Sequence, residues 1–195
     1  MVMNWTEDQI TTMRTGRPEY RNDVQGLISW VRTSEETDGE YSLLYAEASA
    51  GSTVFPHFHT LYEETFHVLE GVLELRVAGD SHRLEAGQEV TVPLRAVHQW
   101  RNPTEGTTRF MVKVRPAHAV FEKWLVVAAG LVADGKTAPD GRPKNPYHGA
   151  LILVESDIHL VGVGRLLMPM MHLLARAARR KGIDRQLEEH YYRQG

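Results

Sequence analysis

Two stretches of the chain decide its fold. Residues 51–64 read GSTVFPHFHTLYEE, and residues 87–102 read GQEVTVPLRAVHQWRN. In an extended strand, alternate side chains point to the same face, so His57 and His59 present their imidazoles together. Glu64 follows a short turn, and we expect a tight hairpin to bring its carboxylate back beside the two imidazoles. Imidazole combined with carboxylate is a donor set typical of divalent transition metals.

A fourth donor comes from the second stretch. Distant strands face one another across the interior of a β-barrel, so His98 can join the site despite its separation in sequence. Glu63 is expected to face away from the site, in solvent, although a slipped turn would make it the carboxylate ligand. The predicted ligands of one divalent metal ion are therefore His57, His59, Glu64 and His98.

Composition narrows the class of protein. The 195 residues include no cysteine, so disulfides and thiolate ligands are excluded, and any metal must be held by nitrogen and oxygen. A hydrophobic fraction of 42% suits one globular domain with an appendage. The net charge of -3 does not indicate a nucleic-acid partner. Residues 1–20 lack a secretory signal and no apolar run has transmembrane length, so we expect a cytoplasmic protein without a membrane partner.

The spacing of these residues resembles the two motifs of the cupin superfamily. The first motif is a glycine, five residues, His-x-His, four residues, Glu, six residues and a glycine, and it matches at Gly51, His57, His59, Glu64 and Gly71. The second is a glycine, five residues, Pro-x-Gly, two residues, His, three residues and Asn, and it matches at Gly87, Pro93, His98 and Asn102. Arg95 stands where the second motif has its middle glycine. The resemblance implies an all-β core, a double-stranded β-helix or jelly-roll barrel.

Short apolar runs between glycines and charged turns support an all-β domain over residues 26–116. The expected strands are Leu27–Val31, Tyr41–Glu47, Glu63–Leu69, Val72–Val77, Glu89–Val92 and Arg109–Arg115. Residues 1–25 are expected to form an irregular or partly helical N-terminal arm.

Residues 117–195 are predicted to form a mainly helical C-terminal extension. Ala117–Val132 and the apolar stripe from Leu166 to Ala178 have helical character, whereas Ala150–Val154 is of unclear type. The stripe is expected to pack on the barrel or on a second subunit, which predicts a homodimer. The arginines near its end make a membrane-surface helix the lesser alternative.

The interior around the metal is predicted to be apolar, as in pockets for small organic ligands. Tyr45 and Glu47 are further candidates for the interior, because the phase of their strand is not fixed. His67 is expected on the exterior. The predicted lining residues of the substrate pocket are Phe55, Phe66, Trp100 and Phe110.

Two classes of function are consistent with these residues. The first is a metal-dependent enzyme acting on a small organic molecule, because cupins with this ligand set include dioxygenases, decarboxylases and isomerases. No general acid or base is identified beside the metal, which favours dioxygenase-like chemistry over isomerase or decarboxylase chemistry. Fe or Mn is the favoured ion, and Zn, Ni, Co and Cu are the alternatives. The second class is a non-catalytic metallo-cupin that binds or senses a small ligand.

Overall fold

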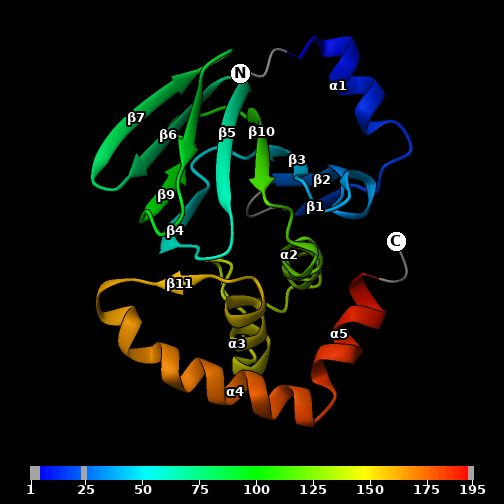
Figure 1. Cartoon of the computed structure of the whole chain (residues 1–195), viewed down its shortest axis with the longest axis vertical. Coiled ribbons are helices and arrows are strands. Elements are labelled where there is room, and N and C mark those ends of the chain that lie inside the picture. The colour runs from blue at the N-terminus through cyan, green and yellow to red at the C-terminus, as the bar shows by residue number, and fades with distance from the viewer. Residues whose placement is uncertain (1–4, 23–25, 193–195) are drawn as a thin grey trace.

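The strands form two antiparallel sheets that face each other (Figure 1). The computed structural model describes residues 5–22 and 26–192. One sheet has the order β1–β2–β3–β10–β5–β8, with bounds Tyr20–Asn22, Gly26–Arg32, Ser42–Ala48, Thr108–Arg115, Glu63–Glu70 and Glu89–Val92. The other has the order β11–β4–β9–β6–β7, with bounds His159–Leu160, Thr53–Phe58, His98–Arg101, Val72–Val77 and Asp80–Glu85.

The predicted all-β core with C-terminal helices is confirmed, and each expected strand is present with ends that differ by at most one residue. The described strands make two facing sheets rather than one closed, hydrogen-bonded barrel. The space between the sheets is filled by apolar side chains from both, including Phe66 and Phe110 from one sheet and Leu73 and Leu75 from the other. Side-chain packing therefore holds the two halves of the jelly roll together.

Strand β3 shows how the alternation of residues sorts side chains. Leu44 and Ala46 belong to the core between the sheets, whereas Leu43 and Tyr45 belong to a second apolar cluster on the outer face. The hydroxyl of Tyr45 donates a hydrogen bond to Glu47 at 2.9 Å. Tyr45 and Glu47 thus share the outer face. Their suggested place in the interior is wrong, because Leu44 and Ala46 are the residues of β3 that point inward and the alternate residues point outward.

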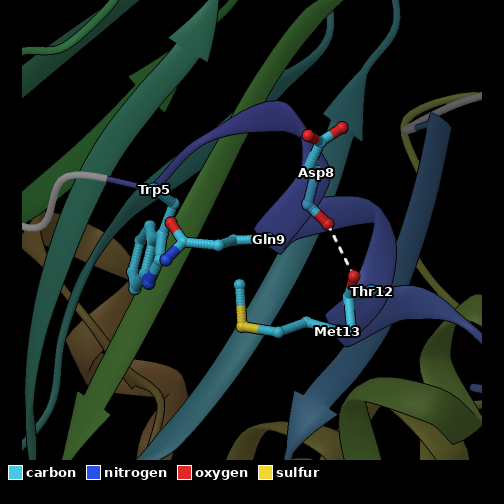
Figure 2. A pocket seen from close by; sticks show the side chains of 5 residues that line it. All are labelled: Trp5, Asp8, Gln9, Thr12 and Met13. Carbon is cyan, nitrogen blue, oxygen red and sulfur yellow. Dashed lines mark hydrogen bonds between the residues drawn. The ribbon is translucent and has the colours of Figure 1, made fainter.

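The N-terminal arm covers this outer face. Helix α1, Glu7–Arg14, begins with a capping box between Thr6 and Gln9. Ile10 of α1 packs in the outer cluster with Tyr45. Figure 2 shows a hollow on this arm, lined by Trp5, Asp8, Gln9, Thr12 and Met13.

The C-terminal extension forms a helical layer beneath the sheets (Figure 1). Its helices α2 to α5 have bounds Ala119–Ala133, Pro146–Glu155, Met168–Arg180 and Ile183–Tyr191, and its short helix η2 spans Gly162–Leu167. Another short helix, η1, spans Glu35–Thr37 between β2 and β3. The unclear segment Ala150–Val154 lies within α3, and the apolar stripe starts in η2 and continues in α4. Within the described residues, no helix is long and apolar enough to cross a membrane.

Helix α2 joins two hydrophobic cores. Phe121 and Val126 pack against the core between the sheets, whereas Trp124 and Leu131 pack with α3, α4 and α5. The extension is thereby fixed against the sheets. Strand β11, between α3 and η2, is added to the edge of the five-stranded sheet beside β4.

Candidate metal centre

The predicted ligands come from both sheets. His57 lies near the end of β4 and His59 just beyond it, while His98 opens the neighbouring strand β9 as the register partner of His57. Glu64 lies on β5, in the opposite sheet. The expected hairpin between His59 and Glu64 is therefore wrong: residues 60–62 cross from one sheet to the other, and the carboxylate reaches the imidazoles across the interior.

The structure brings the four side chains together. One donor atom from each of His57, His59, Glu64 and His98 lies within 4.8 Å of the others, and all four residues are buried. Oε2 of Glu64 lies 3.0 Å from Nε2 of His98 and 3.5 Å from Nε2 of His59. Glu63 is not part of this group.

The same pattern of hydrogen bonds orients all three imidazoles. A main-chain carbonyl can only accept, so an Nδ1 at hydrogen-bonding distance from one carries the proton. Each ring then turns its unprotonated Nε2 toward the centre of the group, as metal-bound histidines do. The acceptors are the main-chain oxygens of Phe55 for His57 at 2.8 Å, Asp157 for His59 at 2.9 Å and Ala96 for His98 at 3.2 Å.

This arrangement fits a cation. Nε2 of His59 and Nε2 of His98 are buried without a hydrogen-bond partner. In the tautomer set by Ala96, Nε2 of His98 is an acceptor that faces another acceptor, the carboxylate of Glu64. Two buried acceptors at this distance repel each other unless a proton or a metal ion lies between them. The four residues could therefore hold one metal ion.

The electrostatics of the group favour the ligand forms of His57 and Glu64. Burial, together with the nearby His98 and His59, lowers the pKa of His57 to about 3, so its ring is neutral. Burial raises the pKa of the Glu64 carboxyl, but the adjacent imidazoles of His59 and His98 outweigh it and hold this pKa well below its usual range. Neutral imidazole and ionised carboxylate are the protonation states that bind metals.

Sequence reasoning missed a residue that supports the site from the extension. Besides its main-chain contact to His59, Asp157 accepts three hydrogen bonds through its carboxylate, from Thr60 N at 2.5 Å, Thr60 Oγ1 at 2.8 Å and Leu61 N at 2.8 Å. Its backbone is left-handed, with φ of 53°. Asp157 thereby fixes both His59 and the crossing segment that leads to Glu64. The only local signal was a short polar run between two apolar segments.

Neighbours of Asp157 strengthen this connection. The Tyr62 hydroxyl donates to the main-chain oxygen of Ser156 at 2.8 Å, and the Tyr62 ring stacks on His59 with centroids 4.4 Å apart. The ring of His159 stacks on Phe58, and its Nε2 lies 2.8 Å from Oδ1 of Asp157. Residues 156–159 therefore contact the chain on both sides of His59, at Phe58 and at Tyr62.

The four predicted pocket residues do not line one space. Phe66 and Phe110 are each 2% exposed and belong to the core, with ring centroids 6.2 Å apart. The partly buried Trp100 lies 5.5 Å from Phe110, and Phe66 lies 6.4 Å from His98. Phe55 lies apart from these three, 47% exposed and beside His57. The first three form an apolar wall on the His98 side of the site.

Two other positions clarify the motifs. His67 is buried on the outer face of β5, edge-on to Trp5 at 5.6 Å, so the arm covers it. Arg95 has a left-handed backbone, with φ of 65°, and its amide donates to the main-chain oxygen of His59 at 2.8 Å. The turn thus requires the conformation that glycine adopts at no steric cost, which explains the motif residue that Arg95 replaces.

Comparison with known proteins places the sheets in a family. Residues 45–114 match the family model for the cupin domain. The chain is 31% identical over 71 residues to quercetin 2,3-dioxygenase of Bacillus subtilis (strain 168), a match that covers 36% of this chain and 21% of that protein. It is 30% identical over 66 residues to polyketide synthase CurC of Streptomyces cyaneus, covering 34% and 43%. The match thus spans less than half the length of either relative.

Among solved structures, the polyketide cyclase RemF from Streptomyces resistomycificus superposes with a TM-score of 0.45 at 20% identity, covering 58% of this chain and 79% of that one. All four buried donors, His57, His59, Glu64 and His98, fall within the matched residues 45–114. Residues 45–114 of this chain are therefore a cupin domain.

Proposed function

We propose that the protein is a metal-dependent enzyme that acts on a small organic molecule, with dioxygenase-like chemistry. The observation that carries this proposal is the buried group of His57, His59, Glu64 and His98, in which Nε2 of His59 and Nε2 of His98 have no hydrogen-bond partner. When bound, a divalent Fe or Mn ion would supply Lewis-acid or redox chemistry there. Four protein donors are fewer than the ligands that these ions commonly take, so a small chelating molecule can also bind.

The surroundings of the site support chemistry centred on the metal. Tyr62 and Asp157, two ionisable neighbours of His59, are both engaged: the Tyr62 hydroxyl donates to Ser156, and the Asp157 carboxylate accepts from Thr60 and Leu61. Neither is free to carry a proton to or from a substrate. The apolar wall of Phe66, Trp100 and Phe110 would exclude water beside His98 and so protect a reactive substrate.

The relatives support two enzyme classes. The match to quercetin 2,3-dioxygenase favours an oxygenase. The match of similar identity is to polyketide synthase CurC, which is not named as an oxygenase. A non-redox enzyme such as an isomerase or decarboxylase is therefore kept as the second candidate. Both matches cover only part of each relative, so the substrate of neither is transferred to this chain.

The test is oxygen uptake by protein reconstituted separately with Fe, Mn, Co, Ni, Cu or Zn under reducing conditions. Catechols, flavonols, diketones and thiols serve as chelating substrates. We expect uptake with Fe or Mn that Glu64→Gln abolishes and the matched control Glu63→Gln retains. Conversion of a substrate without oxygen would instead support the non-redox enzyme, and tight binding of these molecules without turnover would support a binding module.

A further inference from the structure

One face of the C-terminal extension is apolar and exposed. Figure 1 shows α4 at the edge of the molecule farthest from the sheets. Val163 and Leu166 are 85% and 78% exposed, which is high for large apolar side chains. The residues of this surface, the apolar face of α4, are Val163, Leu166, Leu167, Met170 and Leu173.

The apolar face is not needed for packing within the chain. Ala175 and Ala178, on the other side of α4, are fully buried in the helical core with Leu151 of α3. The helix therefore has two apolar sides, and only one is covered. Because residues of the exposed side recur three or four positions apart, they form a continuous stripe along η2 and α4.

The charged residues within this segment of the sequence have one sign. Between Ile158 and Ile183 the sequence contains no aspartate or glutamate. Arg179 pairs with Glu155 of α3, so this cation is partly neutralised from outside the segment. The cations of the segment are Arg165, Arg176, Arg179, Arg180 and Lys181.

We propose that the apolar face of α4 docks on an anionic membrane surface. Leucine, valine and methionine side chains would enter the boundary between headgroups and acyl chains, and the arginines beside them would contact lipid phosphates. An apolar stripe flanked by cations is the arrangement by which amphipathic helices lie in the membrane interface. The attachment is to the surface, and it would place the cupin domain next to the bilayer.

The charge pattern separates this occupant from a second copy of the chain. A symmetric dimer through the same face would bury two identical patches against each other. Each patch carries cations and no acidic residue between Ile158 and Ile183, so the two copies would repel. An anionic lipid surface complements both the apolar and the cationic parts.

The test is co-sedimentation of the full chain with vesicles at low salt. We expect strong binding to vesicles of equal parts phosphatidylglycerol and phosphatidylcholine, weak binding to phosphatidylcholine alone, and release by added salt. Leu166→Ser/Leu173→Ser should abolish binding. Arg176→Gln/Arg180→Gln should weaken it about 25-fold, because each cation near an anionic surface contributes roughly fivefold.

Matched controls remove the same groups elsewhere. Leu94→Ser removes an exposed leucine between β8 and β9, and Arg76→Gln removes an exposed arginine of β6; both should bind as the unaltered chain does. Absence of binding, or equal binding by all variants, would overturn the proposal. So would a dimer, measured by light scattering, that Leu166→Ser/Leu173→Ser converts to a monomer, because the face would then belong to a second copy.

Discussion

The main-chain oxygen of Asp157 lies 2.9 Å from Nδ1 of His59, although 98 residues separate the two along the chain. The contact sets which nitrogen of His59 faces the other donors. It also makes the helical extension part of the metal centre, because Asp157 directly follows Ser156, the C-cap of α3. A cupin domain without this extension would leave Nδ1 of His59 without this acceptor.

We expect Asp157→Ala to lower metal affinity by about 10- to 100-fold, the usual cost of losing a group that orients a ligand. The substitution removes the acceptor for Thr60 and Leu61 and leaves alanine in a left-handed backbone conformation. Asp157→Asn should restore much of the affinity, because asparagine tolerates this conformation and keeps a side-chain oxygen. Affinity is measured by competition with a chromophoric chelator.

The control for this series is Asp140→Ala, which removes a carboxylate paired with Arg142 on the surface. It should bind metal as the unaltered chain does. If Asp157→Ala also bound metal normally, the main-chain contact to His59 would not depend on the Asp157 side chain, and its positioning role would be refuted.

Glu64→Gln should reduce bound metal to a small fraction of one ion per chain, whereas Glu63→Gln should leave it near normal. Glutamine removes the negative charge that offsets the cation in a buried site. Elemental analysis after dialysis measures this. The reverse order of the two glutamate variants would show that the carboxylate ligand was assigned to the wrong residue.

Removing metal from the unaltered chain should lower the unfolding free energy, by about 2.7 kcal/mol relative to protein at a metal concentration 100 times its dissociation constant.

The local parts of the site were predictable from sequence, because they depend on short spacings. His57 and His59 share a strand direction, and motif spacing selected Glu64 over Glu63 and added His98. The six expected strands were found for the same reason, since each has its own apolar pattern. Strand β7, Asp80–Glu85, was not expected, because its sequence is mostly polar and only Leu84 is buried.

Short sequence patterns could not predict contacts between segments that lie far apart in the chain. The hairpin expected between His59 and Glu64 fails because Asp157, from the extension, hydrogen-bonds the segment that crosses between the sheets. The inward placement of Tyr45 fails because β3 is apolar on both faces, and the arm helix that covers the outer face cannot be read from β3 itself. The alternation of apolar and polar residues shows which side chains of a strand point inward only where one face of the strand is polar.

The aromatic residues near the site should differ sharply in their contribution to stability. Phe66→Ala should lower the unfolding free energy by roughly 3–5 kcal/mol, because it leaves a cavity in the core between the sheets. Phe55→Ala should change it by less than about 1 kcal/mol, because the side chain is half exposed. Urea unfolding of the metal-free proteins gives both values. Similar losses for the two variants would contradict the core position of Phe66 and the surface position of Phe55.

Arg95 offers the last test, because its conformation is the one that the motif glycine would adopt freely. With φ of 65°, Arg95 is in the left-handed region, which is unfavourable for any residue with a Cβ atom. Arg95→Gly removes this strain, although glycine loses more backbone entropy on folding. Arg95→Ala keeps the strain and removes the long side chain. We therefore expect Arg95→Gly to be more stable than Arg95→Ala by about 1 kcal/mol in urea unfolding. Both variants keep the amide that donates to His59, so both should bind metal normally, and a glycine variant no more stable than the alanine variant would show that the turn carries no strain.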